Sequence, residues 1–168
     1  MSNGKALQPS PYSKRQYNIH QPGDFDVAVN YSRVLLAIAG AEGELAEAEL
    51  DWYINELVLF GCTEEYLPEI SKEYIATVKN LNWKDVNLEE LLEKINFDFP
   101  MNSPKVILYQ AIKMCRADRD YHQKEKEAIR KAAQILGVSL TDVMAIESLV
   151  EMEEAAEKLR YSVLETIG

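Results

Sequence analysis

The chain has 168 residues, of which 47% are hydrophobic, and this is enough for one domain that buries about 70% of its unfolded surface. Lysine and arginine together contribute 18 residues and aspartate and glutamate 28, so the formal net charge is −10. This charge repels phosphate backbones and anionic lipid, which excludes nucleic acid as a ligand, and it attracts cations and basic proteins. No apolar run reaches the roughly 20 residues of a membrane span, and the N-terminus has no signal-peptide core. We therefore expect a cytoplasmic protein without a membrane span.

The first 23 residues are polar, contain Pro9, Pro11 and Pro22, and have few aliphatic side chains. Such a composition cannot bury enough apolar surface to offset the entropy that is lost on ordering. Residues 1–23 are therefore predicted to be a flexible arm, and residues 24–168 a single domain.

From Asp24 onward the apolar residues recur at helical spacing, and the alternation that marks strands is missing. The predicted helices cover about 25–40, 46–60, 63–79, 87–95, 104–116, 122–136 and 139–165. Their candidate N-caps are Asp24 or Asp26, Thr63, Asn87 and Ser139, and left-handed C′ positions are predicted at Gly61 and Gly137. The expected fold class is all-α, a bundle of about seven helices.

Two segments of the chain, 35–63 and 111–139, align with each other without a gap at an offset of 76 residues. The offset pairs acids with acids: Glu42 with Asp118, Glu44 with Asp120, and Glu49 with Glu125. Between the segments, Pro100 bars helix continuation and Ser103-Pro104 starts a new helix. We therefore predict two pseudo-repeats, about 24–96 and 101–168, each with an acidic turn between two helices.

These acidic turns are candidate metal sites. The first turn offers carboxylate oxygens alone, which favour Ca²⁺ or Mg²⁺, at Glu42, Glu44 and Glu49. The second turn adds an imidazole, which suits Zn²⁺, Mn²⁺ or Fe²⁺, in the set Asp118, Asp120, His122 and Glu125. The second turn is not an EF-hand loop, because Gln123 and Ile129 stand where that loop needs glycine and glutamate.

Helix capping is the alternative explanation of the same acids. An acid at the start of a helix interacts with the positive end of the helix dipole by roughly 0.3–1 kcal/mol. Asp120 and Gln123 also have the spacing of a capping box, and His122 alone can be a solvated or capping side chain. The sequence leaves capping and metal binding both open.

The pattern A-[DE]-G-x-x-x-x-x-E between two apolar helices resembles the turn of the TerB-like tellurite-resistance family, whose motif is A-D-G-x-[IV]-[ST]-x-x-E. The residues that carry the resemblance are Ala41, Glu42, Gly43, Glu44 and Glu49, and again Ala117, Asp118, Asp120 and Glu125. Arg119 replaces the turn glycine in the second copy. The resemblance implies an all-helical domain with acidic metal-binding positions, in bacterial stress responses to toxic oxyanions and metals.

No enzymatic motif is visible, since the chain has no G-x-S-x-G sequence, glycine-rich phosphate loop or paired E-x-x-H motifs. Cys62 and Cys115 are interpreted as isolated apolar side chains and not as a disulfide. We expect a non-enzymatic stress-response module that binds or senses a divalent ion, Ca²⁺, Mg²⁺, Mn²⁺ or Zn²⁺, and docks protein partners. A metal-free adaptor protein is the alternative, and a metal-dependent enzyme is a weaker one.

The last predicted helix adds one expectation about association. Four of its apolar residues fall on one stripe, namely Leu149, Met152, Ala156 and Leu159. Such a stripe usually faces the core of its own domain, and it can also be the face of a homo-oligomer.

Overall fold

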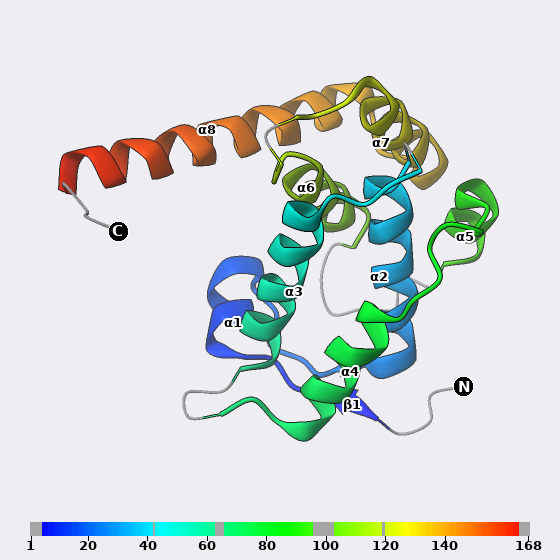
Figure 1. Cartoon of the computed structure of the whole chain (residues 1–168), viewed down its shortest axis with the longest axis vertical. Helices are drawn as coiled ribbons and strands as arrows, with labels where there is room; N and C mark the ends of the chain where they lie inside the picture. The colour runs from blue at the N-terminus through cyan, green and yellow to red at the C-terminus, as the bar shows by residue number, and fades with distance from the viewer. Residues whose placement is uncertain (1–4, 42, 63–65, 96–102, 119, 165–168) are drawn as a thin grey trace.

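Eight helices and one pair of short strands make up the secondary structure of the described residues, 5–41, 43–62, 66–95, 103–118 and 120–164 of a computed structural model (Figure 1). The helices are α1 (Pro11–Tyr17), α2 (Phe25–Ala39), α3 (Glu47–Gly61), α4 (Glu69–Lys79), α5 (Leu88–Lys94), α6 (Ser103–Cys115), α7 (Gln123–Leu136) and α8 (Leu140–Leu164). The strands β1 (Ala6–Leu7) and β2 (Gly23–Asp24) pair antiparallel. Within the described ranges, none of the helices has the length and apolar character that crossing a membrane requires.

The predicted helical bundle is confirmed for this part of the chain, with one difference in the count of elements. Helix α1, strand β1 and the first residue of β2 lie in the segment that was expected to be an arm, so the described residues form eight helices and not about seven. Two-residue strands and a seven-residue helix next to prolines carry too little periodicity to be recognised from sequence. The predicted joint between the halves falls largely on residues 96–102, outside the described residues. The repeat as a whole stays a prediction.

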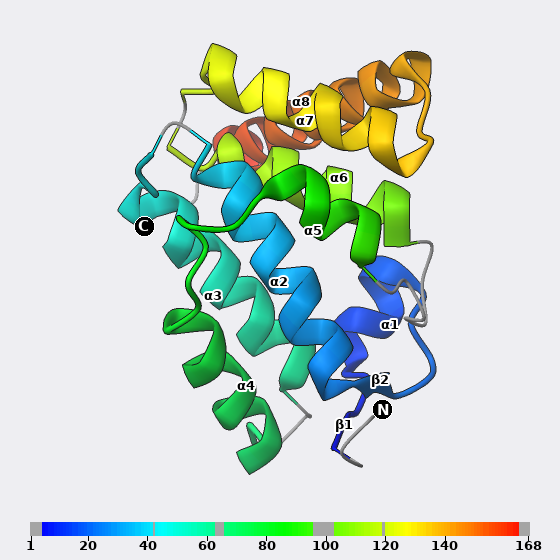
Figure 2. The same ribbon diagram turned by 90° about the vertical axis from the view of Figure 1, so that its right-hand side faces the viewer.

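Helices α2 and α6 form the centre of the bundle. Helix α2 packs against α4, α5, α6 and α7, and Figure 2 shows it running through the middle of the molecule. Leu35, Leu36 and Ile38 in α2, and Ile107 and Leu108 in α6, are almost completely buried. Helices that are apolar all round belong in the interior. Each of these two helices leads directly into one of the acidic turns, so the core fixes where both turns begin.

Most of the predicted helix ends are confirmed. The side chains of Asp24, Asn87 and Ser139 each accept a hydrogen bond from the backbone amide three residues later, at 3.0, 3.0 and 3.1 Å. Gly137 ends α7 with a φ of 75°, the left-handed conformation that glycine adopts without a Cβ clash. Local capping rules therefore locate the ends of α2, α5, α7 and α8.

Two helix ends differ from the prediction. Helix α4 begins at Glu69, after Pro68 as the extended N-cap, whereas the predicted cap Thr63 lies outside the described residues. Gly61 is the last residue of α3 and not a left-handed C′ residue, because the chain continues through an extended Cys62. Packing explains this glycine, since a Cβ at Gly61 would lie 2.6 Å from the Cβ of Ser71 in α4.

The N-terminal segment, residues 5–24, packs on the bundle, which corrects the argument from its composition. Ser10 donates a hydrogen bond from Oγ to the Leu59 carbonyl at 2.7 Å. The hydroxyls of Tyr12 and Tyr17 donate to the two carboxylate oxygens of Glu56, each at 2.6 Å. A few directed polar contacts and tyrosine rings therefore hold a segment that is poor in aliphatic residues.

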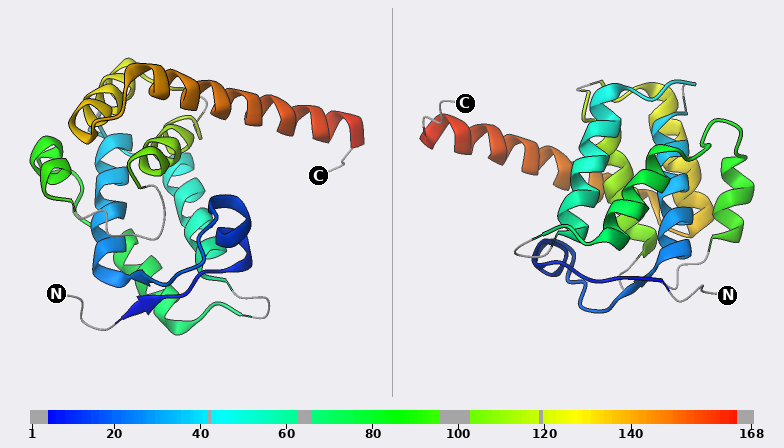
Figure 3. Two further views of the ribbon diagram at one scale, coloured as in Figure 1. Left: turned by 180° about the vertical axis from the view of Figure 1, so that it is seen from behind. Right: turned by 60° about the horizontal axis from the view of Figure 1, so that its bottom comes forward.

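Helix α8 packs on the bundle from its start to just past its middle, and its C-terminal part extends beyond the bundle (Figures 1 and 3). Arg116 forms two hydrogen bonds with the Glu154 carboxylate, both at 2.9 Å. The hydroxyl of Tyr109 donates to Glu153 at 2.7 Å. These contacts from α6 and the turn after it fix the direction in which the rest of α8 projects.

Candidate metal centre

The two acidic turns meet where α3 and α7 begin. Ala46 and His122 are the N-caps of these helices, both with extended backbone. The Ala46 amide donates to Glu49 Oε1 at 3.0 Å, and the His122 amide donates to Glu125 Oε1 at 3.1 Å. Each glutamate is thus the third residue of its helix and caps the helix through its own side chain. The capping box predicted at Asp120 and Gln123 therefore lies two residues later in the structure.

Both glutamates point into the protein and not into solvent. Glu49 is 3% exposed and Glu125 0% exposed. Cys115, the last residue of α6, is buried beside them, and one ligand atom from each of the three residues lies within 4.8 Å of the others. The Oε2 atom of Glu49 is buried and has no hydrogen-bond donor among the described residues. A buried carboxylate oxygen without a donor is costly unless a proton or a cation satisfies it.

The electrostatics of this cluster disfavour additional negative charge. Burial, the neighbouring Glu125 carboxyl and the nearby Asp118 raise the pKa of Glu49 from its ordinary value of 4.5 to about 8, against the opposing effect of the Ala46 amide. Burial and the charge of Glu125 also raise the pKa of the Cys115 thiol. Without a cation, the glutamate pair therefore retains a proton near neutral pH and the thiol stays protonated.

An open hollow connects the cluster with solvent. Its volume is about 480 Å³, and the residues that line it are Gly43, Glu44, Ala46, Glu49, Asp118 and His122. Asp118 Oδ1 accepts a hydrogen bond from the Asp120 amide at 2.9 Å. The exposed Asp120 carboxylate in turn lies 3.1 Å from His122 Nε2. Polar and acidic groups therefore line the path by which a cation would reach Glu49, the member of the cluster that lines the hollow.

The structure separates the predicted ligands into three groups. Glu49 and Glu125 form the buried pair, Glu44, Asp118 and His122 line the hollow, and Asp120 contacts His122 on the outside. Glu42 lies outside the described residues. Sequence reasoning missed Cys115 as a partner of the acids, because the repeat gives no signal: the equivalent residue in the first half is Ala39.

The donor set has the chemistry of a metal centre. Ligand atoms around a tetrahedral zinc ion lie about 3.3–3.8 Å apart, because the bonds measure about 2.0–2.3 Å. A spread of up to 4.8 Å thus requires shifts of only about 1 Å to coordinate one ion. Two carboxylates and a thiolate together also supply more negative charge than a divalent cation needs.

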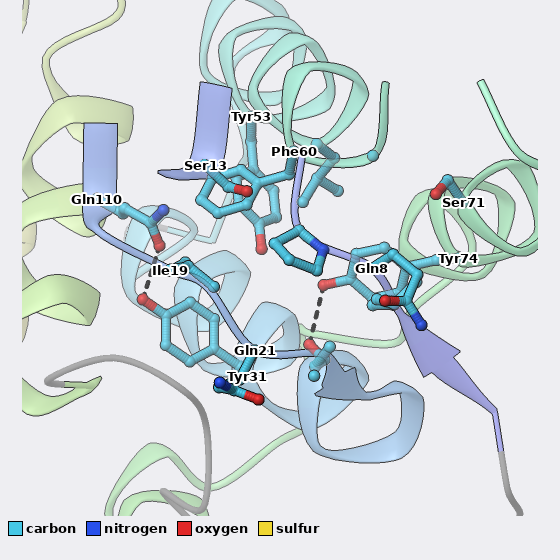
Figure 4. Close-up of a pocket in the computed structure, with 16 residues that line it drawn as sticks. Gln8, Ser13, Ile19, Gln21, Tyr31, Tyr53, Phe60, Ser71, Tyr74 and Gln110 are labelled. Carbon is cyan, nitrogen blue, oxygen red and sulfur yellow. Dashed lines mark hydrogen bonds between the residues drawn. The ribbon is translucent and has the colours of Figure 1, made fainter. Parts of the chain in front are cut away.

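A second cavity lies beneath the N-terminal segment (Figure 4). Its volume is about 70 Å³, and residues of the segment 7–23 form one of its walls. Its hydroxyls already have partners, since Tyr31 donates to Gln110 at 2.6 Å and Tyr74 donates to the Ala28 carbonyl at 3.0 Å. Ligand pockets usually measure about 300–1,000 Å³. This cavity is therefore a packing void and not a second candidate site.

The fold is a mostly helical bundle in which two acidic turns meet at the starts of α3 and α7. Residues 27–148 match the model of the family described as tellurite resistance protein TerB, and the chain belongs to this family. It is also similar to a tellurite resistance protein from Nostoc punctiforme PCC 73102, whose crystal structure was determined at 1.85 Å resolution. The two chains are 27% identical with a TM-score of 0.77, over 100% of this chain and 99% of the other. No curated protein matches this chain.

Proposed function

We propose that this member of the TerB family binds one divalent metal ion between its two acidic turns, without catalysing a reaction. Glu49, Glu125 and Cys115 would be the ligands, and Asp118 would lie at the entrance. The observation that carries the proposal is the pair of buried carboxyl groups that face each other beside a buried thiol.

Two facing carboxylates in the interior require a positive partner. Ionising both without a counter-charge would add like-charge repulsion to the cost of burial. Either a shared proton or a metal ion can relieve this, and the two compete for the same oxygens. Ion binding would release the proton that Glu49 and Glu125 retain near neutral pH, so the site would respond to both metal concentration and pH.

The thiol favours zinc among the candidate ions. Thiolate is a soft ligand that Ca²⁺ and Mg²⁺ do not prefer, whereas Zn²⁺ accepts mixed sulfur and carboxylate ligands. Sequence reasoning assigned an oxygen-only site to the first turn and a histidine-containing site to the second. The geometry instead favours one shared centre, with one glutamate from each turn and Cys115 between them.

The family relationship supports a biological role for the proposed metal binding. The similar protein from Nostoc punctiforme is named a tellurite resistance protein, which supports a role for this chain in resistance to tellurite or metals. In that role the protein would sense an ion and pass the signal to protein partners, with no reaction of its own. The acidic surface implied by the net charge of −10 favours basic partners.

The test is to measure metal in the purified, untagged protein by mass spectrometry, followed by thermal melts in EDTA and with each of Ca²⁺, Mg²⁺, Mn²⁺ and Zn²⁺. We expect a near-stoichiometric ion, or a rise in melting temperature that is largest with Zn²⁺. An ion at about 100 times its dissociation constant stabilises the folded state by about 2.7 kcal/mol. Glu49→Gln should abolish the rise, because an amide is a poor metal ligand.

Glu47→Gln is the matched control, since Glu47 lies in the same first turn but is exposed. Glutamine at position 49 still accepts the Ala46 amide, so the substitution preserves the cap while removing the ligand. Asp118→Asn with Asp120→Asn tests the hollow in the same way. If no ion is found and no melt shifts, the acids are helix caps only, and the metal-free adaptor becomes the better interpretation.

A further inference from the structure

The exposed side of α8 carries an apolar stripe, from its middle to its C-terminal end, that no described part of the chain covers. The stripe consists of Leu149, Met152, Ala156, Leu159 and Val163, spaced alternately by three and four residues. This is the a/d spacing of a coiled coil. Leu149 is 48% exposed, Met152 69%, Leu159 63% and Val163 68%. An exposed seam of this kind marks an interaction surface for another helix.

We propose that α8 of a second copy of this chain covers the stripe, so that the protein forms a homodimer through an antiparallel pair of helices. A coiled-coil seam fits a helix with the same spacing, and the second copy supplies that helix. The contacts that Arg116 and Tyr109 make with α8 hold both helices in fixed directions before they meet. The dimer goes beyond the proposed metal centre and does not depend on it.

The distribution of charge on α8 selects the antiparallel orientation. Between Leu140 and Leu164 there are six acids, none of them after Glu157, whereas the two bases, Lys158 and Arg160, follow them. A parallel pair would set the acid-rich parts of the two helices at the same level. An antiparallel pair places the bases of one copy beside the acids of the other. Arg160 lies over the ring of Tyr161 and makes no ion pair within the described residues, so it can pair across the interface.

One register of the two helices brings their apolar stripes together and also pairs opposite charges. The facing pairs between the copies are Ala156 with Leu159, Met152 with Val163, and Glu153 with Arg160. Glu153 accepts from Tyr109 through Oε1, and Oε2 would accept from Arg160. Two-fold symmetry makes each contact twice. The overlapping parts are the C-terminal parts of the helices (Figure 3), which places the two bundles at opposite ends of the pair. Because each copy contributes a single helix, the interface is small and a micromolar dissociation constant is expected.

Sedimentation velocity of the full chain over a micromolar concentration series tests the dimer. We expect the wild type to shift from monomer to dimer, and Leu159→Glu to raise the dissociation constant by about tenfold or more, because each copy would place a charge in the apolar seam. Met144→Glu is the matched control: Met144 is 56% exposed on the same helix but outside the stripe. Unchanged helical circular dichroism shows that both variants fold.

A wild type that stays monomeric throughout the series, or a Leu159→Glu variant that still dimerises like the control, would overturn the proposal. The orientation is tested by disulfide trapping in a Cys62→Ser background with Ala156→Cys and Leu159→Cys as separate proteins. In the antiparallel register the two variants cross-link preferentially with each other. If each variant instead links to itself, the helices pair in parallel and the proposed register is wrong.

Discussion

Glu49 and Glu125 hold equivalent positions at the starts of α3 and α7, and their carboxyl groups meet inside the protein. Each uses Oε1 to accept the amide of its own N-cap residue. Capping and metal binding therefore do not exclude each other, because one carboxylate can cap a helix with one oxygen and face a cation with the other. The two explanations left open by the sequence are therefore compatible in the same side chains.

The buried pair, Glu49 and Glu125, should make the free energy of unfolding depend on pH. The pKa of Glu49 is about 8 in the folded protein, against an ordinary value of 4.5, so between these values the folded state holds a proton that the unfolded chain has lost. The contribution of Glu49 to the free energy of unfolding of the EDTA-treated protein should therefore be largest below about pH 4.5 and be lost as the pH rises through about 8. Urea unfolding at a series of pH values measures this.

Glu49→Gln is the comparison for the pH series, because a glutamine imitates the protonated glutamate without titrating. The difference in stability between wild type and variant isolates the pair from every other titrating group. It should change across the same pH window, and Glu125→Gln should give a similar result because the two carboxyls titrate as one unit. A difference that is constant with pH would show that the pair does not retain a proton.

The positions of these acids could be predicted from sequence, but their meeting could not. Helical spacing and capping residues locate both turns, and the 76-residue offset matches Glu49 with Glu125. Nothing local states that α3 and α7 begin side by side, since the packing of α2 against α6 decides that. Cys115 was missed for the same reason: a buried thiol at a helix end looks the same in sequence whether apolar groups or carboxylates surround it.

In the proposed metal centre, the Cys115 thiol would determine which ion is preferred. Cys115→Ser keeps the size of the side chain but replaces a soft ligand with a hard, neutral one. The affinity for Zn²⁺ should fall by at least the roughly 10–100-fold that outer-shell substitutions cost, while Ca²⁺ and Mg²⁺ affinities change little. Competition with a chromogenic chelator measures both. Equal losses for all ions would indicate that the substitution disturbs packing, and an unchanged Zn²⁺ affinity would remove Cys115 from the ligand set.

Glu56 should hold the N-terminal segment in place. It is 6% exposed and accepts hydrogen bonds from Tyr12 and Tyr17. Glu56→Ala would leave both hydroxyls without their acceptor, so we expect a loss of about 2–4 kcal/mol in the free energy of unfolding. Limited proteolysis should also cut within residues 5–24 sooner than in the wild type.

Tyr12→Phe and Tyr17→Phe are the controls for this contact, because each removes one donor and leaves the other. Each should cost less than Glu56→Ala, and both should leave metal binding unchanged. The composition of the segment could not reveal this attachment, since its acceptor lies 39 residues from Tyr17 and 44 from Tyr12. If Glu56→Ala neither destabilises the protein nor exposes the segment, other contacts hold it.

Replacing Gly61 by alanine should change the stability of the protein through two effects of opposite sign. Replacing a helical glycine by alanine normally stabilises a protein by about 0.5–1 kcal/mol. Here the new Cβ would lie 2.6 Å from both Cβ and Oγ of Ser71, which is 5% exposed in α4. Overpacking of this kind costs about 1–3 kcal/mol. Gly61→Ala should therefore destabilise the protein in urea unfolding, because the clash outweighs the gain in helix propensity.

The double variant Gly61→Ala with Ser71→Gly separates the two effects. Removing the Ser71 side chain relieves the clash, so the double variant should be more stable than the two single losses added together. A positive coupling would show that close contact between α3 and α4, and not a left-handed turn, requires glycine at this position. Strict additivity would mean that α4 moves away from α3 to accommodate the methyl group.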